Sequence, residues 1–128
     1  MSKIHRFSGN PDEDIYTWEE VQPLLINQDE VQNILKHVLI GPDDGSTNFT
    51  IRYFQVPVGG KTFFHRHEHE HGMLILHGKA KIQINDDFFE LNLLDSLYVS
   101  GEDLHQITNI GDAPLGFLCI IPGKAKEL

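Results

Sequence analysis

Cysteine, positive charge and long apolar runs are all scarce in this 128-residue chain. Its one cysteine, Cys119, excludes an intramolecular disulfide and a zinc ribbon built on cysteines. The 10 lysines and arginines face 19 aspartates and glutamates, and the charge of −9 argues against nucleic acid or an anionic membrane surface as the main partner. Apolar runs such as residues 117–121 are far too short to span a bilayer. Residues 1–10 lack the apolar stretch of a signal peptide, so we expect a cytoplasmic protein.

The chain nevertheless has enough hydrophobic residues, 40%, to form a core, and its length fits one domain. Short segments rich in β-branched and aromatic residues alternate with turn residues, without the long helices of an α/β fold. This pattern is typical of an all-β sandwich or barrel, which we place over residues 34–128. The predicted strands are residues 34–40, 49–56, 63–67, 72–76, 80–84, 88–91, 96–99, 104–109 and 115–121.

Residues 1–33 are more polar, and we interpret them as an N-terminal arm. Thr17, followed three residues later by Glu20, has the pattern of a capping box, which predicts a short helix. Pro23 would end that helix after about one turn. A second short helix, or a turn, is predicted over residues 28–33.

Histidine is the residue in excess: the chain has eight, and five of them lie between positions 65 and 77. Neutral imidazole is the commonest metal-binding side chain near neutral pH. The cluster has three interpretations: a solvated loop, a metalloprotease helix, or a metal site built from two strands. The sequence from His67 to His71 matches H-E-x-x-H, with Glu68 as the base, but Gly72 follows at once and the flanks have strand patterns. The apolar flanks also disfavour a solvated loop.

A site built from two strands fits the spacing better. His65 and His67 are two residues apart, so on one strand they point to the same side. Residues 68–70 then turn, and His71 opens the next strand and faces back across the gap. Among the downstream residues, His105 is the strong candidate for a fourth ligand.

These residues resemble the motifs of the cupin family. The spacing Gly59-x5-His65-x-His67-x3-His71-x6-Gly78 is similar to the first cupin motif, and His105-x3-Asn109 is similar to the end of the second. The resemblance covers residues 38–122 and implies a double-stranded β-helix, the jelly-roll barrel of the RmlC-like cupin superfamily. The usual glutamate of the first motif is replaced by histidine, as in the subgroup of small single-domain cupins with four histidines. Members of that subgroup bind one divalent metal.

The second motif departs further from the family pattern. Leu94, Ser100 and Glu102 stand where that motif usually has Gly, Pro and Gly. These departures leave the backbone path before His105 open. They do not affect the choice of His105 itself as a ligand.

The resemblance implies that one divalent metal ion (Mn, Fe, Ni, Zn or Cu) is bound by His65, His67, His71 and His105. Four neutral imidazoles leave the charge of the ion uncompensated, which favours anionic ligands near it. An octahedral ion would keep two positions open for a small-molecule substrate, alone or together with dioxygen. We therefore predict a metal-dependent enzyme, with dioxygenase-type oxidative chemistry favoured. The alternatives are a non-redox lyase or isomerase, and a non-catalytic ligand-binding or sensor protein.

Strand alternation and the resemblance also indicate the pocket. The last predicted strand lines the site in similar cupins, and its alternate residues share one face. Arg52 and Tyr53 are adjacent, so only one of the two can point inward. The pocket candidates are Thr62, Ile107, Phe117 and Cys119.

The remaining histidines are assigned no role in the site. The glycine spacings place His69 in the connecting loop, where it stays an alternative ligand. His77 precedes a turn and is predicted to be exposed. His5 and His37 are treated as incidental.

Family resemblance also implies a homodimer. An unpaired strand at the edge of a sheet is prone to pair with another chain. We expect the strand over residues 34–40, together with the N-terminal segment, to pair with a second protomer and hide such an edge.

Overall fold

The computed structural model describes residues 1–123, within which nine strands and two short 3-10 helices form. The helices are η1 (Pro11–Glu13) and η2 (Pro42–Asp44). The strands are β1 (Leu24–Gln28), β2 (Val31–Ile40), β3 (Phe49–Val56), β4 (His71–His77), β5 (Ala80–Ile84), β6 (Asp87–Leu91), β7 (Ser96–Val99), β8 (His105–Asn109) and β9 (Leu115–Pro122).

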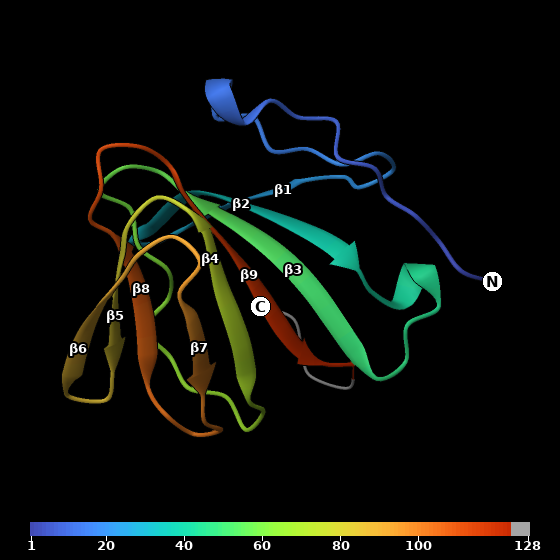
Figure 1. The fold of residues 1–128 in the computed structure, drawn as a ribbon. Coiled ribbons are helices and arrows are strands. Elements are labelled where there is room, and N and C mark those ends of the chain that lie inside the picture. The colour runs from blue at the N-terminus through green and yellow to red at the C-terminus, as the bar shows by residue number, and fades with distance from the viewer. Residues whose placement is uncertain (124–128) are drawn as a thin grey trace.

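Two antiparallel sheets enclose the core (Figure 1). The larger sheet has the strand order β1-β2-β3-β9-β4-β7, and the smaller has the order β6-β5-β8. Ile75 and Phe117 of the larger sheet form one buried cluster with Ile82 and Ile107 of the smaller, so the core lies between the sheets. The all-β prediction is confirmed. Within residues 1–123, no helix is long and apolar enough to cross a membrane.

The central pair of the larger sheet, β3 and β9, sets the inner face that the site uses. Arg52 lies opposite Cys119, and Phe54 lies opposite Phe117. Because side chains alternate between the two faces of a strand, these four point to the same side of the sheet. All four line one pocket between the sheets.

The predicted short helix at Thr17 is wrong. Trp18 forms an isolated β-bridge with Phe7, and the Thr17 hydroxyl is hydrogen-bonded to that of Ser8 at 3.0 Å. Glu20 has a φ of 62°, outside the right-handed helical region. Pairing of the arm with itself therefore overrides the local capping signal.

Residues 28–33 contain a turn rather than a helix, because β1 and β2 pair as an antiparallel hairpin around it. The strand β1 has no counterpart in the sequence prediction. In this hairpin Ile26 lies opposite Ile34. Both side chains, with that of Val31, pack into or against the core.

The N-terminal arm lies beside the larger sheet (Figure 1). Its aromatic rings pack on side chains of the outer face of that sheet. The ring of Tyr16 stacks on that of His77 with 3.9 Å between centroids, and Trp18 lies 5.1 Å from Tyr53. His77 Nε2 is 2.7 Å from the Tyr53 hydroxyl, and its Nδ1 is 2.9 Å from the Pro114 carbonyl. The prediction that His77 is exposed is therefore wrong, since the arm folds back over it and leaves it half-buried.

The expectation that residues 34–40 pair with a second protomer at a sheet edge is also wrong. The strand β2 is hydrogen-bonded on both sides, to β1 and to β3. Among the described strands, β1 forms that edge of the larger sheet. Its residues Leu24 and Leu25 are 54% and 59% exposed.

Candidate metal centre

The segment that carries the first histidines leads from β3 to β4 and runs alongside β8. The sequence predicts a strand over residues 63–67, but this segment is extended with only an isolated bridge between His65 and His105. Thr62 interrupts the regular backbone pairing with β8. Its hydroxyl accepts a hydrogen bond from the backbone N–H of Ile107 at 3.0 Å, and its carbonyl accepts one from the side-chain amide of Gln106. The histidine segment is thus attached to β8 without being a full strand of either sheet.

Two glycines before and after this segment have backbones that other residues rarely adopt. Gly59 has a φ of 76° and Gly78 a φ of 87°. A β-carbon on Gly78 would lie 2.9 Å from both the Leu115 Cα and the Pro114 carbonyl oxygen, which is too close. These conformations account for the two glycines of the first motif.

The second motif keeps its left-handed turns without its glycines. Leu94 has a φ of 70° and Glu102 a φ of 74°. Such a conformation costs a non-glycine residue about 1–2 kcal/mol. Backbone hydrogen bonds connect these turns to β4 and to the histidine segment before it. The Leu94 N–H donates to the Ile75 carbonyl at 2.8 Å, and the Glu102 N–H donates to the His67 carbonyl at 2.6 Å. The path before His105 is therefore held in place despite the substitutions.

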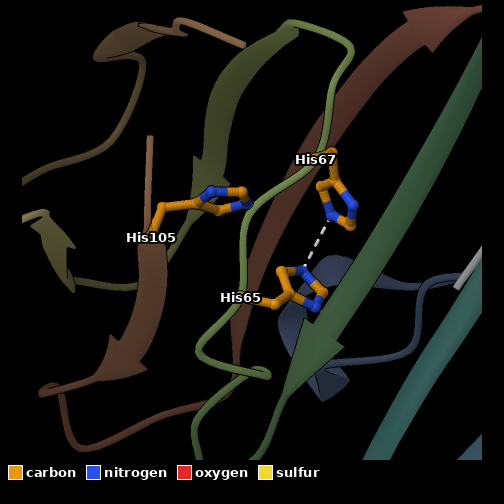
Figure 2. A group of neighbouring side chains, drawn as sticks. All are labelled: His65, His67 and His105. Atoms are coloured by element: carbon orange, nitrogen blue, oxygen red, sulfur yellow. Dashed lines mark hydrogen bonds between the residues drawn. The ribbon is translucent and has the colours of Figure 1, made fainter. Parts of the chain in front are cut away.

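Histidines from two distant parts of the chain converge between the sheets. Figure 2 shows His65 and His67 on the segment before β4, and His105 on β8. The Nε2 atoms of His65 and His67 are 2.9 Å apart. The ring centroid of His105 lies 5.3 Å from that of His65, 5.5 Å from that of His67 and 4.9 Å from that of His71.

Hydrogen bonds determine which nitrogens of His71 and His105 are available. Nδ1 of His105 is 3.0 Å from the Asp103 carbonyl oxygen, which can only accept, so Nδ1 carries the proton and Nε2 keeps its lone pair in the neutral ring. Nδ1 of His71 is 3.2 Å from Cys119 Sγ. Nε2 of His71 is buried and has no hydrogen-bond partner among the described residues. Buried polar atoms without a partner are rare, so this nitrogen is available to bind a ligand.

This donor set fits a divalent transition metal. With metal–nitrogen bonds of about 2.0–2.1 Å, two adjacent ligand nitrogens lie about 3 Å apart and two opposite ones about 4 Å. The 2.9 Å between the Nε2 atoms of His65 and His67 matches an adjacent pair. One candidate ligand atom from each of His65, His67 and His105 lies within 4.8 Å of the others, so these three residues form a group that could hold a metal ion.

A fifth histidine extends the cluster. His67, His69 and His71 form a second group whose ligand atoms lie within 4.8 Å of one another. The ring of His69 is 4.6 Å from that of His67 and 4.9 Å from that of His71. The structure thus brings all four predicted ligands together and adds His69 beside them. In the described part of the chain, neither group includes His5 or His37.

Burial keeps three imidazoles of the cluster, those of His65, His67 and His71, neutral. It lowers the pKa of His65 and of His67 to about 4 and that of His71 to about 3, and the nearby charge of Arg52 lowers all three further. The neutral imidazole is the form that binds a metal ion. These three histidines are therefore in their metal-binding form well below pH 7.

These shifts predict how the stability of the metal-free protein depends on pH. Between pH 6.5 and about 4, the three histidines bind protons in the unfolded chain but not in the folded one, so the free energy of unfolding falls as the pH falls. Thermal unfolding after chelator treatment should show this fall. A variant carrying both His65→Gln and His67→Gln has the same carboxylates and should show a shallower fall. Equal slopes for the two proteins would contradict the prediction.

A pocket of about 560 Å³, part of it open to solvent, extends from the histidines. The predicted pocket residues Thr62, Ile107, Phe117 and Cys119 all line it. Of the adjacent pair on β3, Arg52 lines the pocket, whereas Tyr53 packs under the arm. Alternation along β3 could have identified Phe54, which is two residues beyond Arg52 and lies on the same face. The pocket residues of the β1–β2 hairpin could not be identified in this way. The lining residues that the sequence prediction missed are Ile26, Val31, Ile34, Phe54, Phe63 and Met73.

The family of the chain follows from its central region. A family model of the cupin domain, Cupin_2, matches residues 52–121. The chain belongs to the cupin family. The matched region contains the four predicted ligands of this cupin and ends before the last residue of β9.

Similar proteins support the same fold for this cupin. The 1-methylthio-D-xylulose 5-phosphate methylsulfurylase of Rhodospirillum rubrum is 29% identical over 115 residues, which are 88% of this chain and 72% of that protein. A solved cupin-2 domain from Rhodospirillum rubrum has a TM-score of 0.79 at 28% identity, covering 88% of this chain and 76% of its own. A cupin 2 domain-containing protein from Halorhodospira halophila has a TM-score of 0.71 at 30% identity, covering 98% and 81%. The double-stranded β-helix predicted from the motifs is confirmed.

Proposed function

We propose that this cupin is a metal-dependent enzyme that acts on a small molecule, with one divalent metal ion held by His65, His67, His71 and His105. The observation that carries the proposal is the convergence of neutral imidazoles, one of them with a buried, unpartnered Nε2, at an apolar pocket. A bound transition metal would supply Lewis-acid chemistry there and, if it is redox-active, access to oxygen chemistry.

The residues of the chain prepare the site for such chemistry. Thr62 and the bridge between His65 and His105 fix the histidine segment on β8. Apolar side chains line much of the pocket, and electrostatic interactions are stronger where less water reaches them. Oxidative, dioxygenase-type chemistry remains our first proposal, because four neutral ligands leave positions for a substrate and dioxygen.

A non-redox lyase or isomerase is the second candidate, and a specific observation favours it. The relative from Rhodospirillum rubrum is a methylsulfurylase whose named substrate is a methylthio sugar phosphate. In this chain a thiol, Cys119, lies 3.2 Å from the Nδ1 of His71 and lines the pocket. A non-catalytic sensor would have the same ligands but no turnover.

Metal content and oxygen uptake test the proposal. Untagged protein should contain about one metal ion per chain by elemental analysis. Oxygen consumption with a panel of small molecules should rise above that of chelator-treated protein. Conversion of a substrate without oxygen uptake would favour the lyase or isomerase, and protein without bound metal would overturn the proposed site.

We also propose a homodimer that involves the edge of the larger sheet at β1, where Leu24 and Leu25 are exposed. Pairing or packing at this edge would cover apolar surface and unpaired backbone groups. Light scattering at micromolar concentration should give the mass of two chains, and a monomer there would contradict the proposal. The cytoplasmic location stays a prediction.

A further inference from the structure

The pocket that contains the histidines also has an apolar wall. Its wall includes Ile26, Val31 and Ile34 of the β1–β2 hairpin and the ring of Phe54 on β3. These side chains offer apolar surface to whatever enters. Small-molecule pockets commonly combine such a wall with a few polar groups that orient the ligand.

Arg52 supplies a charge in this pocket. Its side chain is 5% exposed, and one guanidinium nitrogen donates to Cys119 Sγ at 3.0 Å. The guanidinium carbon lies 5.0 Å above the centroid of the Phe54 ring, which holds the group against the apolar wall. The sulfur that it contacts also contacts His71, so the cation lies beside the histidine cluster.

A buried cation attracts negative charge strongly, because water and salt screen the attraction little inside a pocket. The histidine cluster lies in the same pocket, and a divalent ion bound there would add further positive charge. Outside the pocket the chain is strongly acidic, with a formal charge of −9. Attraction of an anion therefore has to be local to this site.

We propose that the substrate is a small organic anion with an apolar body, and that Arg52 binds its carboxylate or phosphate group. This inference rests on the proposed function, because it names the substrate class of that same site. A guanidinium suits either group, since its planar array of N–H donors matches two oxygens of a carboxylate or a phosphate. The hairpin residues Ile26, Val31 and Ile34 contact the apolar body.

Four probes separate the two parts of the proposal in calorimetric titrations of zinc-loaded protein. Benzoate and phenyl phosphate combine an apolar body with an anionic group, benzyl alcohol has the body alone, and acetate has the charge alone. At least one of the first two should bind about tenfold or more tightly than benzyl alcohol and acetate. The tighter of the two identifies the group as carboxylate or phosphate.

Variants assign the effect to the arginine. Arg52→Gln should weaken binding of the better anion about tenfold or more while leaving that of benzyl alcohol unchanged. Arg52→Lys keeps the charge without the planar fork and should give an intermediate affinity, which covers the case in which the glutamine variant does not fold. Arg66→Gln removes an exposed arginine next to the cluster and should have no effect.

The inference is overturned if the Arg52→Gln or Arg52→Lys protein binds the anions as tightly as the unaltered protein does, or if benzyl alcohol binds as tightly as benzoate and phenyl phosphate. Zinc content is measured in parallel for every variant. If the unaltered protein binds no zinc, the proposed function fails. The same titrations on chelator-treated protein then still test the role of Arg52.

Discussion

The His105→Ala variant should lose stoichiometric metal binding and keep its fold. His105 lies on β8, far in sequence from the other proposed ligands, and its Nε2 keeps the lone pair while Nδ1 faces the Asp103 carbonyl. Removing it takes away one of the four proposed ligands. We expect metal affinity to fall by at least about a hundredfold, since even removing a hydrogen-bond partner of a ligand costs 10–100-fold. Elemental analysis after dialysis, with circular dichroism to check the fold, measures this.

His69→Ala is the matched control, because His69 stacks against the same cluster but is outside the proposed ligand set. This variant should keep about one metal ion per chain. Full metal content in the His105 variant would refute the proposed site. If the His69 variant loses metal and the His105 variant retains it, the metal is bound by the group of His67, His69 and His71 instead.

The Cys119→Ala variant should bind metal about 10–100-fold more weakly, because it lacks the thiol that we expect to position His71 as a ligand. Once Nε2 of His71 is used for metal binding, Nδ1 carries the proton and donates to Cys119 Sγ, 3.2 Å away. Arg52 donates to the same sulfur at 3.0 Å, so the sulfur is held between two donors. Without it, a buried N–H of His71 loses its acceptor and the ring loses its fixed orientation.

Competition with a chelator measures the affinity, and the visible spectrum of the cobalt-substituted protein reports the ligand geometry. Cys119→Ser retains an acceptor and should restore most of the affinity. Ile121→Val alters another buried residue on the same face of β9 and should change stability alone. If the alanine variant shows unchanged affinity and an unchanged cobalt spectrum, Cys119 has no positioning role.

Local sequence patterns predicted most of the sheets. The strands β3, β5 and β7 have their predicted bounds, because alternation of apolar residues and the turn residues that follow are both local signals. The motif spacing likewise predicted that His65, His67 and His71 lie close to His105, which follows His71 by 34 residues. The predicted strand over residues 63–67 was not needed for this, because an extended segment with one bridge to His105 places the side chains as well.

Contacts between distant segments that no motif marks, such as those of the N-terminal arm, could not be predicted. The capping pattern at Thr17 is local, but the arm satisfies its backbone by pairing with itself and packs its rings on the sheet. The same packing buries His77, which looks exposed from its neighbours alone. β1 is a five-residue segment with exposed leucines at its start, so its sequence carried too little periodicity to predict its role in the pocket wall.

The pocket is lined by two parts of the chain, and only one of them lies within the region that matches the cupin family model. The proposed ligands lie within residues 52–121, which match the cupin domain, whereas Ile26, Val31 and Ile34 belong to a hairpin outside that region. Mutations in the hairpin can therefore reshape the apolar wall without touching any ligand histidine. Selectivity and reactivity can evolve, or be engineered, separately in such an arrangement. Libraries restricted to β1 and the start of β2 would change the proposed substrate pocket and leave the proposed metal ligands unaltered.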